Sequence, residues 1–478
     1  MEMRRIVLLL ASVVLAVGVL FFGTHALVGG GGTQTAAAQT AQPNIVYILT
    51  DDMRKDDLEF MPKTRALLKD KGMTFDNAFV SNALCCPSRA TIMRGQYSHN
   101  TTVFTNGGYS NYIKLGGEGD NMGTRLRGAG YRTGLFGKYM NGYNGSYVPV
   151  GWSDWFSGSL SGDEFFNYDI NDNGQQRHYG TSDSDYITDV LKGETQQFIG
   201  ASVAQGKPFF AYVAPTAPHD PATPAPRHAH AYDGLKAPRP SSFNERDVSD
   251  KPPWIRQLPS LSSSDIAQID KRYEKRAESL QAVDGLVEGV VNKLNSAGVM
   301  GNTYVVFTSD HGYHHGEHRI PYAKGRPYEE SNRVPLLVRG PGVAAGSTTY
   351  KMALNTDHLP TFTSLAGTQT PPYVDGRSLR PVLNQSATTW RDAILLEGPG
   401  NGARIASPTY YGIRTAGSSK QKYVEYAGSG AKELYYLGSD PLELTNKYSS
   451  GAASGLASRL QALKGCAQDT CRTAENGQ

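Results

Sequence analysis

Five short apolar runs constrain the fold of this 478-residue chain more than any other feature. The first, residues 44–49, reads Asn-Ile-Val-Tyr-Ile-Leu and is almost continuously apolar and β-branched. A strand with one face in water alternates polar and apolar residues, so a continuous run indicates a strand that is buried on both faces. Similar runs follow at residues 208–213, 303–308, 334–338 and 393–396.

A long amphipathic segment lies between the second and third runs. Its apolar residues recur from Ile266 to Leu294 at spacings close to the 3.6-residue helical period. Ser263 or Ser264 can cap the start of this helix, and Gly298 suits its end. Buried strands that alternate with helices predict an α/β fold, with a large, mostly parallel sheet flanked by helices.

The pattern changes near residue 375, where short strands and turns replace the long apolar runs, before a final helix near residues 452–463. We therefore predict one large α/β domain over residues 43–375. A smaller C-terminal α+β subdomain is expected over residues 376–478.

The first 38 residues predict an export segment. Arg4 and Arg5 precede the uncharged residues 6–22, a Gly-rich spacer follows, and Ala36–Ala38 offer small residues for cleavage. The apolar stretch is also long enough to span a membrane, so an uncleaved anchor formed by residues 6–22 is the alternative to a signal peptide. Either way, the protein is expected to be secreted or otherwise extracytoplasmic.

The charge and the cysteine content of the chain exclude several classes of protein and of metal site. Lys and Arg number 47 against 44 Asp and Glu, a net charge of +3, so nucleic acid is not an expected partner. Four cysteines are too few for a disulfide-rich miniprotein, and their spacing does not fit a paired Cys-x-x-Cys zinc site. In an exported chain, Cys466 and Cys471 are expected to form a local disulfide.

Acidic residues follow two of the predicted strands. Asp51 and Asp52 follow the first run after Thr50, and Asp310 and His311 follow the third run after Ser309. Sites in parallel α/β sheets form at the carboxyl ends of strands, so these side chains converge if the two strands are neighbours. Three clustered carboxylates favour a hard divalent cation, Ca²⁺ or Mg²⁺. The alternative is that Asp51 and Asp52 cap a helix.

Residues 84–95 read Leu-Cys-Cys-Pro-Ser-Arg-Ala-Thr-Ile-Met-Arg-Gly. Pro87 suits the first turn of a helix, which places Cys85 and Cys86 at a helix N-terminus that favours an anion. Arg89, one turn later, adds a fixed positive charge at the same end. The alternative is that two small cysteines are buried in a packed turn.

The Cys-x-Pro-Ser-Arg sequence, with Asp-Asp upstream after a strand, resembles the signature of the type I, formylglycine-dependent sulfatases. The resemblance covers about residues 43–471 and is closest to the N-acetylglucosamine-6-sulfatase, extracellular heparan 6-sulfatase and arylsulfatase branch. It implies an alkaline-phosphatase-like fold. Other segments that resemble the family are residues 137–143, 217–219, 309–318 and 433–446.

The resemblance also implies a cofactor and a modified residue. In this family the first cysteine of the signature, here Cys85, is oxidised to formylglycine by a formylglycine-generating enzyme that recognises Pro87 and Arg89. The resemblance implies one bound Ca²⁺, in preference to Mg²⁺. Its implied ligands are Asp51, Asp52, Cys85, Asp310 and His311.

The remaining roles come from the same resemblance. Asp310 would help to deprotonate the attacking hydroxyl of the hydrated aldehyde. Arg89 and Lys138 would hold that hydrate and neutralise negative charge, and Lys138 is also expected to bind the substrate. Lys324 would grip a sulfate oxygen, and His219 would hydrogen-bond or protonate the ester oxygen. Taken alone, Lys138 is typical of a turn and His219 of a loop.

One position departs from the family pattern. Many sulfatases carry a histidine shortly after the lysine of the Gly-Lys segment, where this chain has Met140 and Asn141. Asn141 is kept as a substrate-pocket residue. His314, His315 and His318 are left outside the metal site, because their spacing lacks the His-Glu-x-x-His pattern of a zinc helix.

The expected activity is hydrolysis of sulfate monoesters, either aryl or carbohydrate sulfates such as glucosamine 6-sulfate. The expected partners are a sulfated small molecule or glycan and, during maturation, the formylglycine-generating enzyme. A membrane is a partner only if the N-terminal segment is uncleaved. Two alternatives stay open: a phosphodiesterase or phosphonate monoester hydrolase of the same superfamily, and a catalytically inactive relative that binds sulfated glycans.

Overall fold

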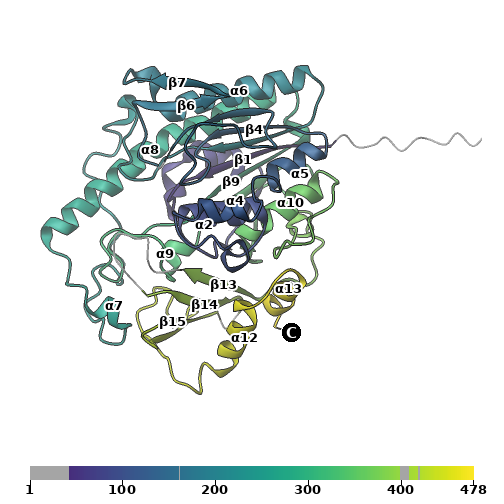
Figure 1. Ribbon diagram of the computed structural model, residues 1–478. Helices are drawn as coiled ribbons and strands as arrows, with labels where there is room; N and C mark the ends of the chain where they lie inside the picture. The colour runs from purple at the N-terminus through teal and green to yellow at the C-terminus, as the bar shows by residue number, and fades with distance from the viewer. Residues whose placement is uncertain (1–41, 161, 399–407, 418–419, 478) are drawn as a thin grey trace, which may run out of the picture. The chain divides into compact units, whose positions relative to one another are not determined.

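The computed structural model describes residues 42–160, 162–398, 408–417 and 420–477 (Figure 1). The predicted export segment, with its anchor alternative, lies outside the described residues. No helix within the described ranges combines the length and the hydropathy that crossing a membrane requires.

A ten-stranded sheet forms the centre of the structure, and its five middle strands, from β9 to β5, are parallel. Antiparallel pairs flank this parallel region on both sides. The sheet confirms the predicted mixed, mostly parallel α/β architecture. Its strands, in spatial order, are β11 (Ser347–Thr349), β2 (Met73–Phe75), β10 (Leu336–Arg339), β9 (Thr303–Ser309), β1 (Asn44–Thr50), β8 (Phe209–Ala214), β4 (Arg132–Gly137), β5 (Asp154–Ser157), β6 (Tyr168–Asp172) and β7 (Gln175–Tyr179).

The central strand β1 explains why the apolar runs are continuous. Tyr47 and Leu49 face one hydrophobic cluster with α2 (Cys85–Arg94) and α10 (His358–Leu365). Val46 and Ile48 face another with α6 (Ile187–Ala204) and α8 (Ser263–Ser296). Because successive side chains of a strand point to opposite faces, a strand with helices on both faces must be apolar at every position.

Shorter helices complete the layers around the sheet (Figure 1). They include α1 (Pro62–Thr64), α3 (Ser98–Thr101), α4 (Tyr109–Lys114), α5 (Met122–Gly128), α7 (Pro253–Arg256), α9 (Glu329–Asn332) and α11 (Arg380–Leu383). Strands β3 (Ala78–Phe79) and β12 (Ala353–Leu354) form a separate parallel pair.

The long helix α8 begins one residue earlier than the sequence predicts. The Ser262 hydroxyl accepts a hydrogen bond from the Asp265 amide at 3.2 Å, and the Asp265 carboxylate accepts one from the Ser262 amide at 2.8 Å. This reciprocal pair caps the helix, so the predicted cap at Ser263 or Ser264 is wrong. Gly298 follows the helix with a positive φ of 71°, as its predicted place past the end requires.

The last apolar run forms β13 (Ala393–Gly398), which lies in a second sheet. This antiparallel sheet continues through β14 (Tyr410–Thr415), β15 (Gln421–Tyr426) and β16 (Lys432–Tyr436). Residues of β13 share one hydrophobic cluster with α12 (Ser454–Lys464), α13 (Asp469–Glu475) and Tyr97. The run is therefore continuous because β13 is fully buried, although it does not extend the main sheet.

Two polar contacts of Glu397, in β13, connect the second sheet to helix α3. The Glu397 carboxylate accepts a hydrogen bond from the Ser98 amide at 2.7 Å and lies 3.0 Å from His99 Nδ1. Further along the chain, Cys466 and Cys471 form the predicted disulfide. The division of the chain at residue 375 stays a prediction.

Gly137, the last residue of β4, determines the position of the residue that follows it, Lys138. Gly137 has a φ of 101°, and a Cβ added there would lie 2.2 Å from the Ala214 carbonyl oxygen. That same oxygen accepts a hydrogen bond from the Lys138 amide at 2.9 Å. A side chain at position 137 would therefore displace Lys138 from the strand end.

Gly137→Ala is expected to lower the free energy of unfolding by about 3 kcal/mol or more, because backbone strain and a steric clash add together. Gly206→Ala is the matched control: Gly206 also has a positive φ, 62°, but a Cβ there meets nothing within 4 Å. That variant should lose only about 1 kcal/mol. Urea titrations of both variants measure the difference, and equal losses would contradict the clash at Ala214.

Candidate functional site

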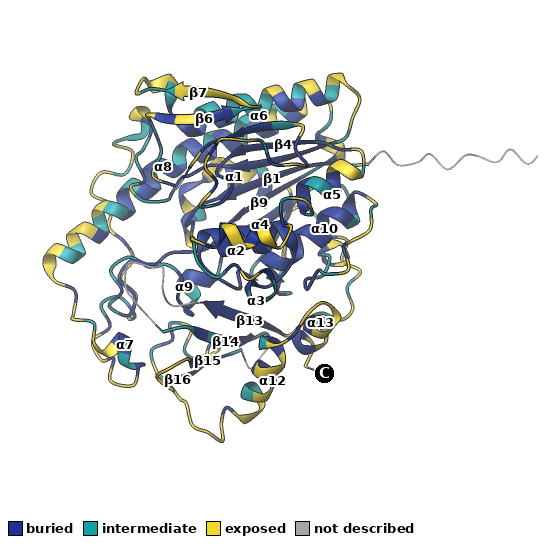
Figure 2. Ribbon diagram, viewed as in Figure 1, coloured by how far each residue is buried: buried dark blue, intermediate teal, exposed yellow. Residues whose placement is uncertain are grey.

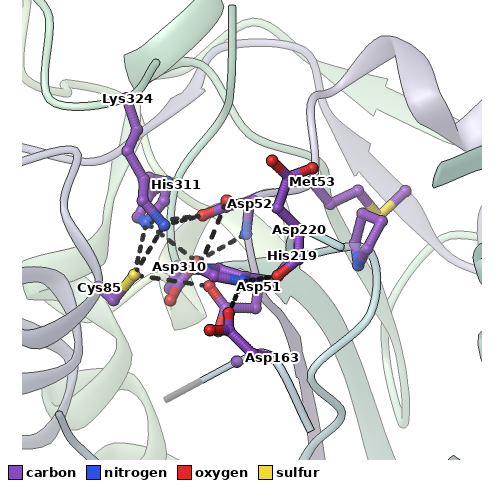
Figure 3. Close-up of polar contacts among 12 residues, drawn as sticks. Asp51, Asp52, Met53, Cys85, Asp163, His219, Asp220, Asp310, His311 and Lys324 are labelled. Carbon is purple, nitrogen blue, oxygen red and sulfur yellow. Dashed lines mark hydrogen bonds and ion pairs between the residues drawn. The ribbon is translucent and has the colours of Figure 1, made fainter. Parts of the chain in front are cut away.

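The two strand ends that carry acidic residues meet in the structure. Strands β1 and β9 are parallel neighbours, with Thr50 opposite Ser309. The Asp52 amide donates to Asp310 Oδ1 at 3.1 Å, and the Asp310 amide donates to the Thr50 carbonyl at 3.1 Å. The predicted adjacency of these strands is confirmed, and their carboxylates gather at one edge of the sheet (Figure 3).

Helix α2 brings Cys85 to these carboxylates. Cys85 is the first residue of the helix, and Gly95 ends it in the left-handed conformation. The Ser88 hydroxyl donates to the Asp310 carbonyl at 2.5 Å and accepts from the Asn355 side chain at 3.0 Å. These bonds fix the helix N-terminus against the end of β9.

The Cys85 sulfur lies at the focus of the site. Its Sγ is 3.2 Å from Lys324 Nζ, 3.3 Å from His311 Nε2 and 3.6 Å from Asp51 Oδ1 (Figure 3). Burial opposes ionisation of the thiol, but Lys138 and Lys324 outweigh it and hold the pKa of Cys85 well below its usual value.

Cys86 has different surroundings, although it is the next residue. Its Sγ donates to the Asn141 carbonyl at 3.7 Å, and its amide donates to Asn106 Oδ1 at 3.0 Å. Burial, with the neighbouring Cys85, raises the pKa of Cys86 to about 12. The two adjacent thiols are therefore chemically distinct.

Three cations balance the three carboxylates. Lys138 forms a salt bridge with Asp51, and Lys324 Nζ lies 2.7 Å from Asp52 Oδ1. Arg89 donates from Nε to Asp310 Oδ2 at 2.9 Å and from a terminal nitrogen to the Lys138 carbonyl at 2.8 Å. Charge compensation is what allows these carboxylates to be buried.

The three carboxylates nevertheless differ in acidity. Burial raises the pKa of Asp51, but Lys138, His219 and Arg89 outweigh it and hold that pKa well below the ordinary value. The pKa of Asp52 is also lowered despite burial, mainly by the charge of Lys324. Burial and then the charge of Asp51 raise the pKa of Asp310 to about 6. Asp310 is thus the carboxylate that is best suited to accept a proton near neutral pH.

Four of the predicted metal ligands form one compact group. Ligand atoms of Asp51, Asp52, Cys85 and His311 all lie within 4.8 Å of one another, and all four residues are buried. His311 Nδ1 lies 2.9 Å from the Gly312 carbonyl, which leaves Nε2 directed at Cys85 and Asp52. Metal-binding histidines are oriented in this way.

The fifth predicted ligand, Asp310, borders this group. Its Oδ1 is 3.6 Å from His311 Nε2, while its Oδ2 is held by Arg89. Carboxylates with one imidazole form a donor set that suits a hard divalent cation, so these residues fit a bound Ca²⁺.

His219 and Lys324 form the partly open side of the site. Each side chain is 15% exposed, whereas Cys85 and the predicted metal ligands are at most 1% exposed. His219 Nε2 lies 3.9 Å from Asp52 Oδ2. Burial and Lys324 lower the pKa of His219, but Asp52 and Asp51 outweigh them and raise it.

The other candidates take different places. The Asn141 side-chain oxygen is buried without a hydrogen-bond partner among the described residues, and the backbone of Asn141 receives the Cys86 thiol. His314, His315 and His318 are buried and do not belong to the compact group around Cys85, and burial lowers the pKa of each. His318 Nδ1 lies 2.7 Å from Glu245.

Comparison with known proteins decides the family. Residues 43–368 match the family model described as sulfatase, which is more than half of the chain. The chain belongs to the sulfatase family, a class of sulfuric ester hydrolases. Residues 316–466 also match the model described as N-sulphoglucosamine sulphohydrolase, C-terminal.

Two relatives show how far the likeness of this sulfatase extends. It is 35% identical to human N-acetylglucosamine-6-sulfatase over 497 residues, which cover 94% of this chain and 89% of that protein. It is 38% identical over 380 residues to the extracellular sulfatase SULF-1 homolog of Drosophila melanogaster, which cover 76% of this chain but only 34% of that protein.

A solved structure confirms the fold. A protein in complex with its substrate, D-glucosamine-2-N,6-O-disulfate, superposes with a TM-score of 0.77 at 24% sequence identity. The match covers 91% of this sulfatase and 99% of the other chain.

The sequence analysis missed a buried arginine that joins two parts of the site. Arg276 of α8 donates to the Asp52 carbonyl at 2.6 Å and to the Pro218 carbonyl at 2.8 Å, and it is 1% exposed. It thereby fixes the strand end that carries Asp52 and the loop that carries His219. Arg276 could have been found in the sequence as a charged residue on the apolar face of α8, between Tyr273 and Leu280.

Arg276→Ala in the sulfatase should lower kcat/KM for 4-nitrophenyl sulfate by about 10- to 100-fold, because both carbonyls lose their donor and the groups they position shift. The affinity for Ca²⁺, measured by calorimetry, should fall as well. Arg256→Ala, at an exposed position of α7, is the control and should change neither quantity. A folded Arg276→Ala protein with unchanged turnover and Ca²⁺ affinity would refute the positioning role.

Proposed function

We propose that this sulfatase hydrolyses sulfate monoesters of sugars, with glucosamine 6-sulfate as the expected example, and also cleaves aryl sulfates. It uses formylglycine made from Cys85 and one Ca²⁺. The observation that carries this proposal is the position of Cys85 Sγ, within 3.3 Å of both Lys324 and His311 and beside buried carboxylates. No other described cysteine has such surroundings, because Cys86 faces Asn141 and the remaining two form a disulfide.

The modified residue and the cation provide the chemistry that an unmodified side chain lacks. When present, the hydrated aldehyde supplies one hydroxyl to attack sulfur and a second whose deprotonation expels sulfate, and the cation supplies positive charge beside the sulfate oxygens. Asp51, Asp52, Asp310 and His311, with an oxygen at position 85, are the proposed ligands.

The remaining steps belong to the side chains around position 85. Asp310, with its pKa raised to about 6, takes up the proton of the attacking hydroxyl. His219, whose raised pKa keeps it protonated to higher pH, donates a proton to the leaving oxygen as the sulfur–oxygen bond breaks. Lys324 and Lys138 stabilise the negative charge on the sulfate oxygens, and Arg89 holds Asp310 in place.

The sugar substrate and the location of the enzyme rest on its relatives. Human N-acetylglucosamine-6-sulfatase is similar over nearly the whole chain, which supports a sulfated glucosamine as substrate. The fly relative is described as extracellular, in keeping with an exported enzyme. Export by the N-terminal segment and maturation by a formylglycine-generating enzyme are parts of the same proposal.

One set of assays tests both which sulfate esters the enzyme cleaves and whether it prefers sulfur or phosphorus as the central atom of the ester. We expect sulfate release from 4-nitrophenyl sulfate and from glucosamine 6-sulfate, with much lower kcat/KM for 4-nitrophenyl phosphate and for a phenylphosphonate monoester. Parallel initial-rate assays measure the four values. A preference for either phosphorus ester would show that the enzyme is a phosphohydrolase and overturn the proposed activity. Inactivity on every ester would favour a binding role.

The two adjacent cysteines provide a matched pair of variants. Cys85→Ala should abolish turnover, whereas Cys86→Ala should keep most of it, because only Cys85 faces the cations and carboxylates. Mass spectrometry of the tryptic peptide Gly72–Arg89 from active protein should show formylglycine at position 85. Full activity with an intact Cys85 thiol, or the reverse pattern of losses, would contradict the mechanism.

A further inference from the structure

We propose that a pocket between α6 and the main sheet, outside the catalytic site, binds a small organic cation that carries an ammonium group on an apolar body. The catalytic mechanism uses none of the side chains that line this α6 pocket. Binding there therefore does not depend on the proposed substrate or on turnover.

The α6 pocket is a cavity of about 300 Å³ between α6 and the strands β4, β5 and β6 (Figure 1). Pockets for small molecules typically have volumes of about 300–1,000 Å³, so this cavity suits a ligand at the small end of the range. Arg177 of β7, a strand whose residues are mostly exposed, also lines it (Figure 2). The side chains that matter most are Arg132, Phe136, Asp154, Asp172, Glu194 and Phe198.

The charged wall of the α6 pocket lies at the opposite ends of the strands from the catalytic site. Arg132 is the first residue of β4, and Asp154 is the first residue of β5, which runs parallel to β4. Lys138 of the catalytic site instead follows the last residue of β4. The α6 pocket is also separate from the pocket beside His219, which Asp163, Asp220 and residues of α8 line.

Aromatic rings form the apolar wall of the α6 pocket. The rings of Phe136 and Phe198 lie 5.3 Å apart at an angle of 58°. A Cβ at Gly134 would lie 2.6 Å from the Phe136 ring and 3.0 Å from the Phe198 ring, so a glycine is what leaves these rings their room. The Arg132 guanidinium lies 5.0 Å from the centre of the Phe198 ring. One of these rings thus already has a cation near it, the kind of group that aromatic faces attract.

The charges around the α6 pocket leave one negative charge without a partner. Arg132 pairs with Asp154 at 2.7 Å, and Arg177 pairs with Asp172 at 2.7 Å. The third carboxylate, Glu194, forms no ion pair with any residue in the part of the chain that the structure describes. Three carboxylates therefore face two guanidinium groups, a balance that favours a ligand with one positive charge.

The hydrogen-bonding state of the carboxylates points the same way. Asp154 Oδ2 is buried and has no hydrogen-bond partner among the described residues, although Oδ1 is held by Arg132. Burial raises the pKa of Asp154, and burial together with the charge of Asp172 raises the pKa of Glu194. An ammonium group would donate N–H to the free oxygen of Asp154 and would stabilise the charged form of both carboxylates.

The two walls together define the class of ligand. A bare metal ion would satisfy the carboxylates but would leave the rings of Phe136 and Phe198 without a partner. A neutral apolar molecule would contact the rings but would leave Glu194 and Asp154 Oδ2 as they are. A small organic ammonium ion satisfies both walls, with its charge toward Glu194 and its apolar body against the rings.

Binding to the full-length protein tests this assignment by calorimetry with three probes. Cyclohexylamine, which is protonated at neutral pH, carries both the charge and an apolar ring, whereas cyclohexanol lacks the charge and methylamine lacks the ring. We expect cyclohexylamine to bind about tenfold more tightly than either of the others, because one charge-assisted hydrogen bond or the burial of one ring is lost in each. Equal affinity for cyclohexanol or for methylamine would overturn the assignment.

Variants of the same protein locate the binding. Glu194→Gln removes the unpaired charge and should lower the affinity for cyclohexylamine about tenfold. Ala201→Phe, at an exposed position of α6 that lines the pocket, should lower it similarly because the added ring fills the cavity. Glu288→Gln, at an exposed position of α8 outside the pocket, is the matched control and should leave the affinity unchanged. Binding that survives both pocket variants, or that the control weakens equally, would show that the amine binds elsewhere and would overturn the assignment.

Discussion

Compensation of buried charge is the interaction on which this structure depends. Asp51, Asp52 and Asp310 lie fully buried at the ends of two neighbouring strands, where uncompensated carboxylates would be strongly destabilising. Arg89 and two lysines, supplied by α2, the end of β4 and a loop after β9, provide the opposite charge. The sheet and the helix therefore have to come together correctly for the site to be stable at all. The same balance leaves one carboxylate, Asp310, ready to accept a proton.

The long helix α8 links the chemistry to its surroundings. One side of α8 packs into the hydrophobic cluster under the sheet, and Arg276 on that side holds the carbonyls of Asp52 and Pro218. The neighbouring Arg272 and Lys275 face the pocket beside His219. A single helix thus fixes the strand end that carries Asp52 and the loop that carries His219, and it borders the pocket beside that histidine.

Much of the fold followed from local patterns, because continuous apolar runs have few solutions other than doubly covered strands. The place of the candidate site could also be predicted, because Asp51 and Asp310 each lie one residue beyond such a run. The apolar run at residues 393–396 did not by itself show which sheet it joins, because burial looks the same in either sheet. The cap at Ser262 was missed among several adjacent serines. Lys275 carries no local signal, because only the folded chain brings it into one pocket with Asp163 and Asp220.

The complete burial of α2 has a consequence for how active enzyme is made. Every residue from Cys85 to Arg94 is buried, whereas a surface helix such as α12 carries exposed residues (Figure 2). An enzyme that recognises Cys85, Pro87 and Arg89 can contact them only while the chain is still open. In the proposed maturation, modification and folding therefore compete kinetically, and a molecule that folds first keeps its thiol. On this proposal, the active fraction of a preparation is decided during biosynthesis, before the finished protein meets any substrate.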